Sequence, residues 1–149
     1  MAAYVVDASV VIQYAIVQEQ TPEARSLVAR MYEVDKLHIP EFCLLECTNV
    51  VWKQVRFYGL PPTNAEQIIQ ELLRLPFQVE SVSHLLPSAL QIGLAYQLAV
   101  YDSLYVALAQ HLSLPVVTVD DRQSVAASES SVVVKPIGDF STSPSSDKG

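Results

Sequence analysis

The sequence is short of positive charge. It has 9 Lys and Arg residues against 16 Asp and Glu residues, which gives a formal net charge of −7 at pH 7. Non-specific binding to nucleic acid depends on basic surface that neutralises phosphates, so this balance argues against it. A small local group of cations that grips one nucleic-acid segment is still compatible with the composition.

Long apolar runs are missing as well. No apolar run reaches the roughly 18 residues of a membrane-spanning helix. A signal peptide requires a basic segment before its apolar residues, and the N-terminal residues here have none. We therefore expect a cytoplasmic protein with no membrane association. The 149 residues, 50% of them hydrophobic, suit one domain with a sizeable core.

Cysteine, histidine and glycine are scarce. Cys43 and Cys47 are the only cysteines, and the three His residues show no ligand spacing. Two Cys residues four apart on a helix are able to bind a soft metal or form a redox pair. Their apolar surroundings favour buried small side chains instead. With four glycines in all, the chain has no glycine-rich phosphate-binding loop.

Apolar β-branched runs alternate with helical patterns, which predicts an α/β domain with a mainly parallel, five-stranded sheet. We expect strands over residues 3–6, 37–39, 77–82, 115–119 and 132–134. We expect helices over residues 21–31, 41–58, 63–73, 89–98 and 101–112. The polar residues 141–149 lack a pattern and are expected to be a disordered tail, so the domain spans residues 1–140.

Three helix ends carry recognisable signals. Thr21 before a proline is typical of an N-cap. Thr63 with Glu66 three residues later matches a capping box. Gly59 is suited to end the second helix, because a left-handed backbone there costs glycine little.

Four acids lie in otherwise apolar surroundings. Asp7 ends the first expected strand, and Asp120 follows the strand at 115–119. Asp102 opens an apolar helix, and Glu46 interrupts the apolar helix FCLLECTNVVW. In parallel sheets, ligands gather at the carboxyl ends of the strands, where a functional acid is expected.

Each of these acids also has a structural interpretation. Asp7 and Asp102 are suited to cap the helices that follow them. Asp120, or its neighbour Asp121, is suited to form a turn. Glu46 is placed to contact Asn49 or Lys53 on the same face of its helix. Each acid taken singly therefore leaves both interpretations open.

Taken together, the acids favour a metal site. Four neighbouring carboxylates repel one another in a low-dielectric cleft unless they are protonated or neutralised. Mg²⁺ and Mn²⁺ prefer oxygen ligands and keep several waters, which suits chemistry on phosphate groups. We therefore expect a divalent-metal centre that acts on a phosphoryl group.

Four segments resemble the PIN-domain ribonucleases, and specifically the small VapC-type toxins of bacterial toxin–antitoxin pairs. They are VVDAS (5–9), PEFCLLECTNVVWK (40–53), YDSLYVALA (101–109) and PVVTVDDR (115–122). Their order and spacing match over about residues 3–137. The resemblance implies a three-layer PIN-like fold, a parallel sheet with helices on both faces, and an acidic pocket that holds Mg²⁺ or Mn²⁺.

By motif position, the resemblance makes the acidic quartet Asp7, Glu46, Asp102 and Asp120. Asp7 and Asp102 would hold the principal metal, with Glu46 binding directly or through water. Asp120 would hold a second metal or orient the attacking water, and Asp121 is the alternative fourth acid.

Other positions complete this assignment. Ser9 matches a hydroxyl residue that supports the first aspartate, and Asn49 matches a polar position after the glutamate. Lys53, Arg56 and Arg122 are the cations nearest in sequence to the acids and are candidates to grip RNA phosphates, or else they are solvated surface charges. The resemblance also implies a homodimer and inhibition by an antitoxin protein.

The expected function is thus metal-dependent endoribonuclease activity. The alternative is a PIN-like module that binds RNA or protein with little turnover, which the low basic content favours. A phosphotransfer receiver domain fits the acids at the strand ends. It lacks an acidic pair at the first strand, however, and Lys135 is the only candidate for its late lysine.

Overall fold

The computed structural model describes residues 1–16 and 18–141, and over these residues it has one five-stranded sheet. The sheet order is β3-β2-β1-β4-β5, and all four pairings are parallel. The strands are β1 (Ala3–Val6), β2 (Lys36–Pro40), β3 (Gln78–Glu80), β4 (Val116–Val117) and β5 (Val134–Lys135). All five expected strands are present, and β3, β4 and β5 are shorter than expected.

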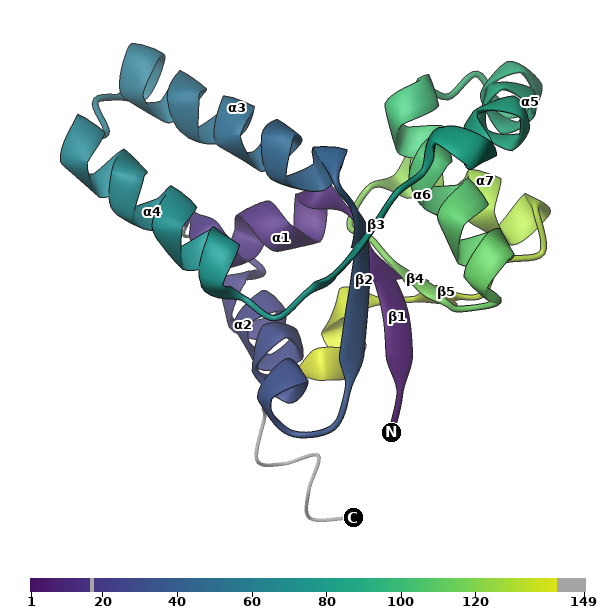
Figure 1. Ribbon diagram of the computed structural model, residues 1–149, viewed down its shortest axis with the longest axis horizontal. Helices are drawn as coiled ribbons and strands as arrows, with labels where there is room; N and C mark the ends of the chain where they lie inside the picture. Colours follow the sequence, from purple (N-terminus) through teal and green to yellow (C-terminus); the bar gives the residue numbers. More distant parts are fainter. Residues whose placement is uncertain (17, 142–149) are drawn as a thin grey trace.

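Helices cover both faces of the sheet (Figure 1). On one side lie α1 (Ala8–Ala15), α2 (Thr21–Ala29), α3 (Phe42–Tyr58) and α4 (Pro62–Arg74). On the other side lie α5 (Leu86–Tyr96), α6 (Val100–Leu112) and α7 (Asp121–Glu129). Short 3₁₀ turns η1 (Arg30–Tyr32), η2 (Ser83–Leu85) and η3 (Ile137–Phe140) complete the described chain. The predicted three-layer α/β architecture is confirmed.

Strand β1 is the centre of the sheet and of the core. Val5 and Val6 are almost completely buried, because helices lie on both faces of the strand. Helix α6 packs on β1, β2 and β4, and its residues 103–109 are all buried. Val6 pairs with Val117 of β4, so the residues that follow these two strands emerge side by side.

Of the three helix-end signals, only one is confirmed. Gly59 has a φ of 78° and ends α3, with its backbone N–H bonded to the carbonyl of Gln54. Helix α2 begins at Thr21 itself, whose hydroxyl donates to the backbone oxygen of Gln13 at 2.6 Å instead of capping the helix. The capping box at Thr63 is also wrong: α4 begins at Pro62, since a proline presets the helical φ, and Thr63 lies inside the first turn.

Two helices go beyond the sequence expectations. The eight-residue α1 and the nine-residue α7 begin directly after Asp7 and Asp120, which are their N-caps. Helices this short depend on tertiary packing more than on their own propensity. Each starts where a strand of the central pair ends, and this places the two capping carboxylates at the carboxyl edge of the sheet.

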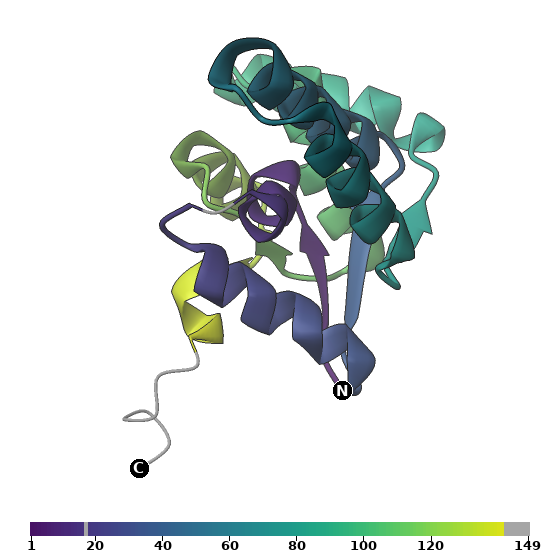
Figure 2. The same cartoon turned by 90° about the vertical axis from the view of Figure 1, so that its left-hand side faces the viewer.

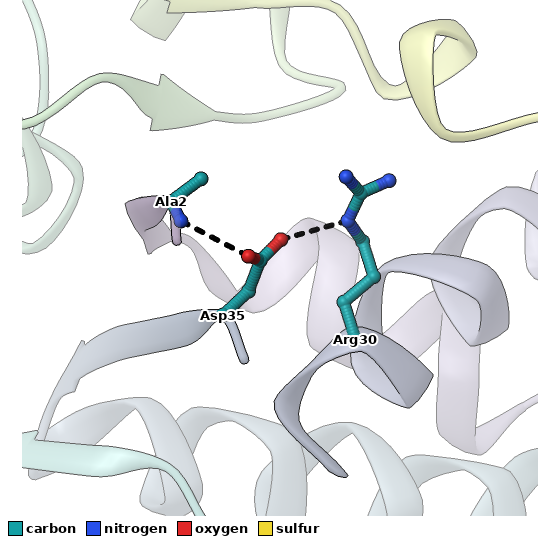
Figure 3. Close-up of polar contacts among 3 residues, drawn as sticks. All are labelled: Ala2, Arg30 and Asp35. Carbon is teal, nitrogen blue, oxygen red and sulfur yellow. Dashed lines mark hydrogen bonds and ion pairs between the residues drawn. The ribbon is translucent and has the colours of Figure 1, made fainter. Parts of the chain in front are cut away.

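The opposite edge of the sheet is held by a polar contact (Figure 3). The buried carboxylate of Asp35, just before β2, accepts a hydrogen bond from the backbone N–H of Ala2 at 3.0 Å and another from Arg30 Nε at 2.8 Å. Figure 2 shows the N-terminus beside the end of α2 that leads into Arg30. The contact therefore joins the beginning of β1 to the connection between α2 and β2.

Helices α5 and α6 are both rich in apolar residues. No single helix among the described residues is long and apolar enough to cross a membrane. Taken together, the segments Ser83–Tyr96 and Val100–Leu112 have the length and apolar composition of a membrane span, but the chain bends by 117° between them. Most of α6 lies in the protein core, which accounts for its apolar sequence.

Candidate active site

Asp7 is the deepest acid of the candidate site. It follows β1, is 4% exposed and caps α1 by accepting from the backbone N–H of Val10 at 3.3 Å. Its Oδ1 also accepts from the hydroxyl of Ser9 at 2.5 Å, and its Oδ2 from the hydroxyl of Thr118 at 2.7 Å. The capping interpretation of Asp7 is therefore correct, and the same carboxylate also belongs to a larger polar network.

That network joins the ends of β1 and β4. Thr118 Oγ1 accepts from the backbone N–H of Asp120 at 3.0 Å, while Ser9 Oγ accepts from the backbone N–H of Val119 at 3.2 Å. Ser9 thus supports Asp7 as the sequence suggests. Thr118 has the same role and was not anticipated. Its signal is a hydroxyl residue inside an apolar strand two positions before an acid.

Burial dominates the protonation of Asp7. Removal of the carboxylate from water raises its pKa from 3.8 to about 6, and the negative charge of Asp120 adds to this. The hydrogen bonds from Ser9, Thr118 and Val10 act in the opposite direction. Among the described residues no Lys, Arg or His forms an ion pair with Asp7. The site thus contains a buried carboxylate with no compensating cation.

Asp102 lies in the first turn of α6, whose N-cap is Ala99, so the capping interpretation of Asp102 is wrong. Its pKa is raised, first by burial and then by the charge of Asp120, while Arg122 acts to lower it. Asp120 itself caps α7, with Oδ1 accepting from the backbone N–H of Gln123 at 3.1 Å. The structure therefore brings Asp102 and Asp120 together from two different helices.

Glu46 has a partner that the sequence did not suggest. Its Oε1 accepts from the hydroxyl of Tyr105 at 2.7 Å. Within the described part of the chain it makes no hydrogen bond or ion pair with Asn49 or Lys53, so the structural interpretation of Glu46 as a contact along α3 is wrong. Burial raises the pKa of Glu46, the bond from Tyr105 acts to lower it, and the charge of Asp102 raises it again. A tyrosine within an apolar helix was the available signal, because a buried Tyr hydroxyl needs a polar partner.

The charges of the four acids raise one another's pKa values in a chain of pairs, which we call the row of acids. Asp120 acts on Asp7 and on Asp102, and Asp102 acts on Glu46. Asp121 does not contribute to these shifts. It is exposed and borders a separate hollow of about 310 Å³ with Thr118 and Ser124. Of the two adjacent acids, Asp120 is the one beside the other carboxylates.

A cleft of about 300 Å³ opens between α1 and α3, and Glu46 is the one acid of the four in its lining. Its polar lining comes from Ser9, Glu46, Asn49 and Lys53. Arg56 lies one turn beyond Lys53, toward the C-terminal end of α3. The remaining candidate cation, Arg122, donates a hydrogen bond to the backbone oxygen of Gln97, and its charge acts to lower the pKa of Asp102.

The donor set suits a hard cation in part. Within residues 1–16 and 18–141, no three His, Cys, Asp or Glu side chains are close enough to hold one ion together. The available donors are carboxylate oxygens, which Mg²⁺ and Mn²⁺ prefer. Because Mg²⁺ keeps several waters and is often bound through one or two carboxylates, the chemistry of this pocket fits it without a closed cage.

The two cysteines lie in the protein core. Cys43 and Cys47 are both fully buried, and the hydrogen bond with Cys47, followed by burial, raises the pKa of the Cys43 thiol. Their interpretation as buried small side chains agrees with this environment.

Four acids gathered near the carboxyl edge of a fully parallel sheet, with helices on both faces, define the class of this domain. A family model described as the PIN domain matches residues 4–129. The chain therefore belongs to the PIN-domain family, which confirms the resemblance found in the sequence.

Individual relatives agree with this assignment. The chain is 30% identical over 118 residues to ribonuclease VapC3 of Pyrobaculum aerophilum, covering 78% of this chain and 88% of the relative. The crystal structure of PAE2754 from the same organism has a TM-score of 0.72 at 21% identity and covers 93% of each chain. A toxin–antitoxin complex from Klebsiella pneumoniae has a TM-score of 0.57 at 15% identity, covering 81% of this chain and 89% of the other. At these identities the two structures bear on the fold.

Proposed function

We propose that this protein is a metal-dependent endoribonuclease that hydrolyses RNA phosphodiester bonds and is the toxin of a toxin–antitoxin pair. The row of four coupled acids beside an open cleft is the observation that carries the proposal. The raised pKa of Asp7 supports it, because an acid buried without a cation is suited to receive one. The relative named a ribonuclease supports the same activity.

In this proposal Asp7, Glu46, Asp102 and Asp120 hold Mg²⁺ or Mn²⁺, directly or through water. The bound cation supplies charge neutralisation at the phosphate and an activated water. Ser9 and Thr118 keep both oxygens of Asp7 oriented by their hydroxyls.

The remaining polar groups have supporting parts. Tyr105 occupies one oxygen of Glu46 and thereby fixes the direction of the other. Asn49 and Lys53 line the cleft, where they would contact the substrate strand, and Arg122 lies beside Asp102. Arg56 continues the cationic surface along α3.

The antitoxin is the proposed protein partner, since the structure from Klebsiella pneumoniae is described as a toxin–antitoxin complex. A second copy of the chain is the proposed partner for the outer face of α5. Leu86, Leu90 and Leu94 are spaced four apart there and are 49%, 52% and 69% exposed. An apolar stripe of this kind is typical of a helix that packs on another protein surface. Size-exclusion chromatography with light scattering should give a dimer that Leu90→Glu converts to a monomer.

The function is tested with purified protein, free of antitoxin by mass spectrometry, incubated with RNA in Mn²⁺, in Mg²⁺ and in EDTA. Asp102→Asn is the test variant and Asp121→Asn is the matched control, because Asp121 lies outside the row of acids. We expect cleavage that needs metal, falls at least about 100-fold in Asp102→Asn and is unchanged in Asp121→Asn. Equal cleavage by Asp102→Asn would indicate a contaminating nuclease. No cleavage by a folded wild-type protein would instead favour the binding module.

A further inference from the structure

The outer surface of α3 carries an unusual group of side chains for so acidic a chain. Residues 47–65 contain no Asp or Glu, whereas Lys53 and Arg56 lie one turn apart on this helix. Neither cation forms an ion pair with an acid of the described chain. Both charges are therefore available to an anionic ligand.

Exposed aromatic rings accompany these cations. Trp52 and Phe57 are 55% and 61% exposed, and their rings meet edge to face with centroids 6.1 Å apart. The guanidinium of Arg56 lies 5.0 Å from the centroid of the Phe57 ring. Proteins bind single-stranded nucleic acid with this combination of exposed rings and unpaired cations. The bases stack on the aromatic and guanidinium planes, and the phosphates pair with the cations.

This surface is continuous with the candidate active site. Glu46, Asn49, Lys53 and Phe57 follow one another at spacings of three and four residues, so they share one face of α3. The first three line the cleft beside the acids. A strand held in the cleft is thus led along the helix toward the Phe57 ring.

We propose that the α3 track, defined as Trp52, Lys53, Arg56 and Phe57, binds the single-stranded nucleotides that flank the cleaved phosphodiester. The proposal rests on the ribonuclease function proposed above and adds the surface that selects single-stranded over duplex substrate. Lys53 and Arg56 pair with phosphates, and Trp52 and Phe57 stack with bases. In a duplex the base faces are already stacked on one another, so the rings have nothing to bind.

A protein partner is the competing occupant. Trp52 also borders an apolar hollow of about 470 Å³ between α3 and α4, lined by Val51, Val55 and Ile69 among others. The unpaired cations favour RNA over an apolar protein segment. The test therefore has to separate the two occupants.

The experiment measures RNA binding without cleavage. A fluorescein-labelled single-stranded 12-nucleotide RNA and a blunt duplex of the same sequence are titrated with full-length protein in EDTA, with fluorescence anisotropy as the readout. Trp52→Leu and Phe57→Leu are the test variants. Tyr58→Leu is the matched control, because Tyr58 is an aromatic residue of α3 that is still more exposed, at 75%, but lies about 160° around the helix from Arg56.

We expect each test variant to bind the single strand on the order of tenfold more weakly, the loss typical of one stacked base. Duplex affinity and the Tyr58→Leu variant should be unchanged. Circular dichroism confirms that each variant is folded. Single-strand affinity equal to that of the wild type in both test variants would overturn the proposal and assign this surface to a protein partner.

The cations give an independent readout. Lys53→Gln and Arg56→Gln should each reduce the slope of log Kd against log salt by about 0.7, the value for one phosphate contact on a single strand. Arg74→Gln, an exposed cation at the end of α4, is the control and should leave the slope unchanged. Unchanged slopes for both test variants would contradict the track.

Failure here is distinguishable from failure of the proposed function. If cleavage depends on metal and all α3 variants bind RNA normally, the α3 track is refuted and the ribonuclease function is retained. Loss of single-strand binding in the test variants, without cleavage by the wild type, leaves an RNA-binding module. Absence of both RNA binding and cleavage removes both proposals.

Discussion

Two buried aspartates at opposite edges of the same sheet have opposite environments. Asp35 is 7% exposed at the amino edge, and its hydrogen bonds from Arg30 and Ala2 lower its pKa (Figure 3). Asp7 is 4% exposed at the carboxyl edge, where burial raises its pKa to about 6. Both carboxylates accept hydrogen bonds, but only Asp35 has a cation.

The difference separates a structural acid from a functional one. A buried carboxylate with a counter-ion and hydrogen bonds is stable as it is and needs nothing further. One that faces other acids without a cation retains an electrostatic cost, which shows as the raised pKa. Ligand-binding sites commonly contain such unfavourable electrostatic interactions, because the bound ligand neutralises them.

The largest expected effect comes from adding the missing cation. Mn²⁺ at 100 times its dissociation constant should raise the free energy of unfolding of the wild-type protein by about 2.7 kcal/mol. Asp35→Asn should retain this gain and Asp7→Asn should lose most of it. Urea unfolding with and without Mn²⁺ measures both. An equal gain in Asp7→Asn would place the metal away from Asp7.

Removing the charge at the paired acid is expected to destabilise the fold. Asp35→Asn loses the charge-assisted bond from Arg30, and the free energy of unfolding at pH 7.5 should fall by about 2 kcal/mol. The loss is limited because the Arg30 side chain is 43% exposed and stays hydrated. Urea unfolding monitored by circular dichroism is the measurement, and an unchanged midpoint would show that the contact is not stabilising.

The same substitution at the other acid is expected to have the opposite sign. The pKa shift of Asp7 from 3.8 to about 6 corresponds to about 3 kcal/mol of charge burial, of which a lost hydrogen bond cancels about 1 kcal/mol. Asp7→Asn in EDTA at pH 8 should therefore unfold with a free energy higher by about 1 to 2 kcal/mol. A destabilised Asp7→Asn protein would show that its hydrogen bonds outweigh the buried charge.

The smallest effect is a dependence on pH. Because the folded state binds a proton at Asp7 more tightly than the unfolded state does, stability rises as pH falls from 8 through about 6. By pH 5 the Asp7 contribution should amount to about 1 kcal/mol. The contribution of Asp35 is lost only as pH falls through its lowered pKa, below 3.8. Unfolding curves in EDTA between pH 8 and 5 should rise in the wild type and less in Asp7→Asn.

Several elements were predictable because their signals are local. The buried strand before Asp7, the apolar helix at Val100–Leu112 and the glycine that ends α3 follow from hydrophobic periodicity and backbone preference. The N-caps were harder. Thr21 and Thr63 have the right residue type, but a contact with Gln13 and a preceding proline decided where these helices begin.

The partners inside the site were not predictable in the same way. The structural alternative for Glu46 placed its contacts within its own helix, yet its partner Tyr105 is 59 residues away in the chain. Thr118 and Asp7 are separated by 111 residues and meet only because β1 and β4 are neighbours in the sheet.

By itself, the sequence determined the α/β class, the candidate acids and the family resemblance, because residue type, periodicity and motif spacing are properties of the chain alone. Only the tertiary structure decided which acid is compensated and which is not. Arg30 lies within reach of Asp35, and no cation pairs with Asp7 among the described residues. The physical reason is that a carboxylate's environment depends on burial and on charges brought close by strand order, and these exist only in the folded chain.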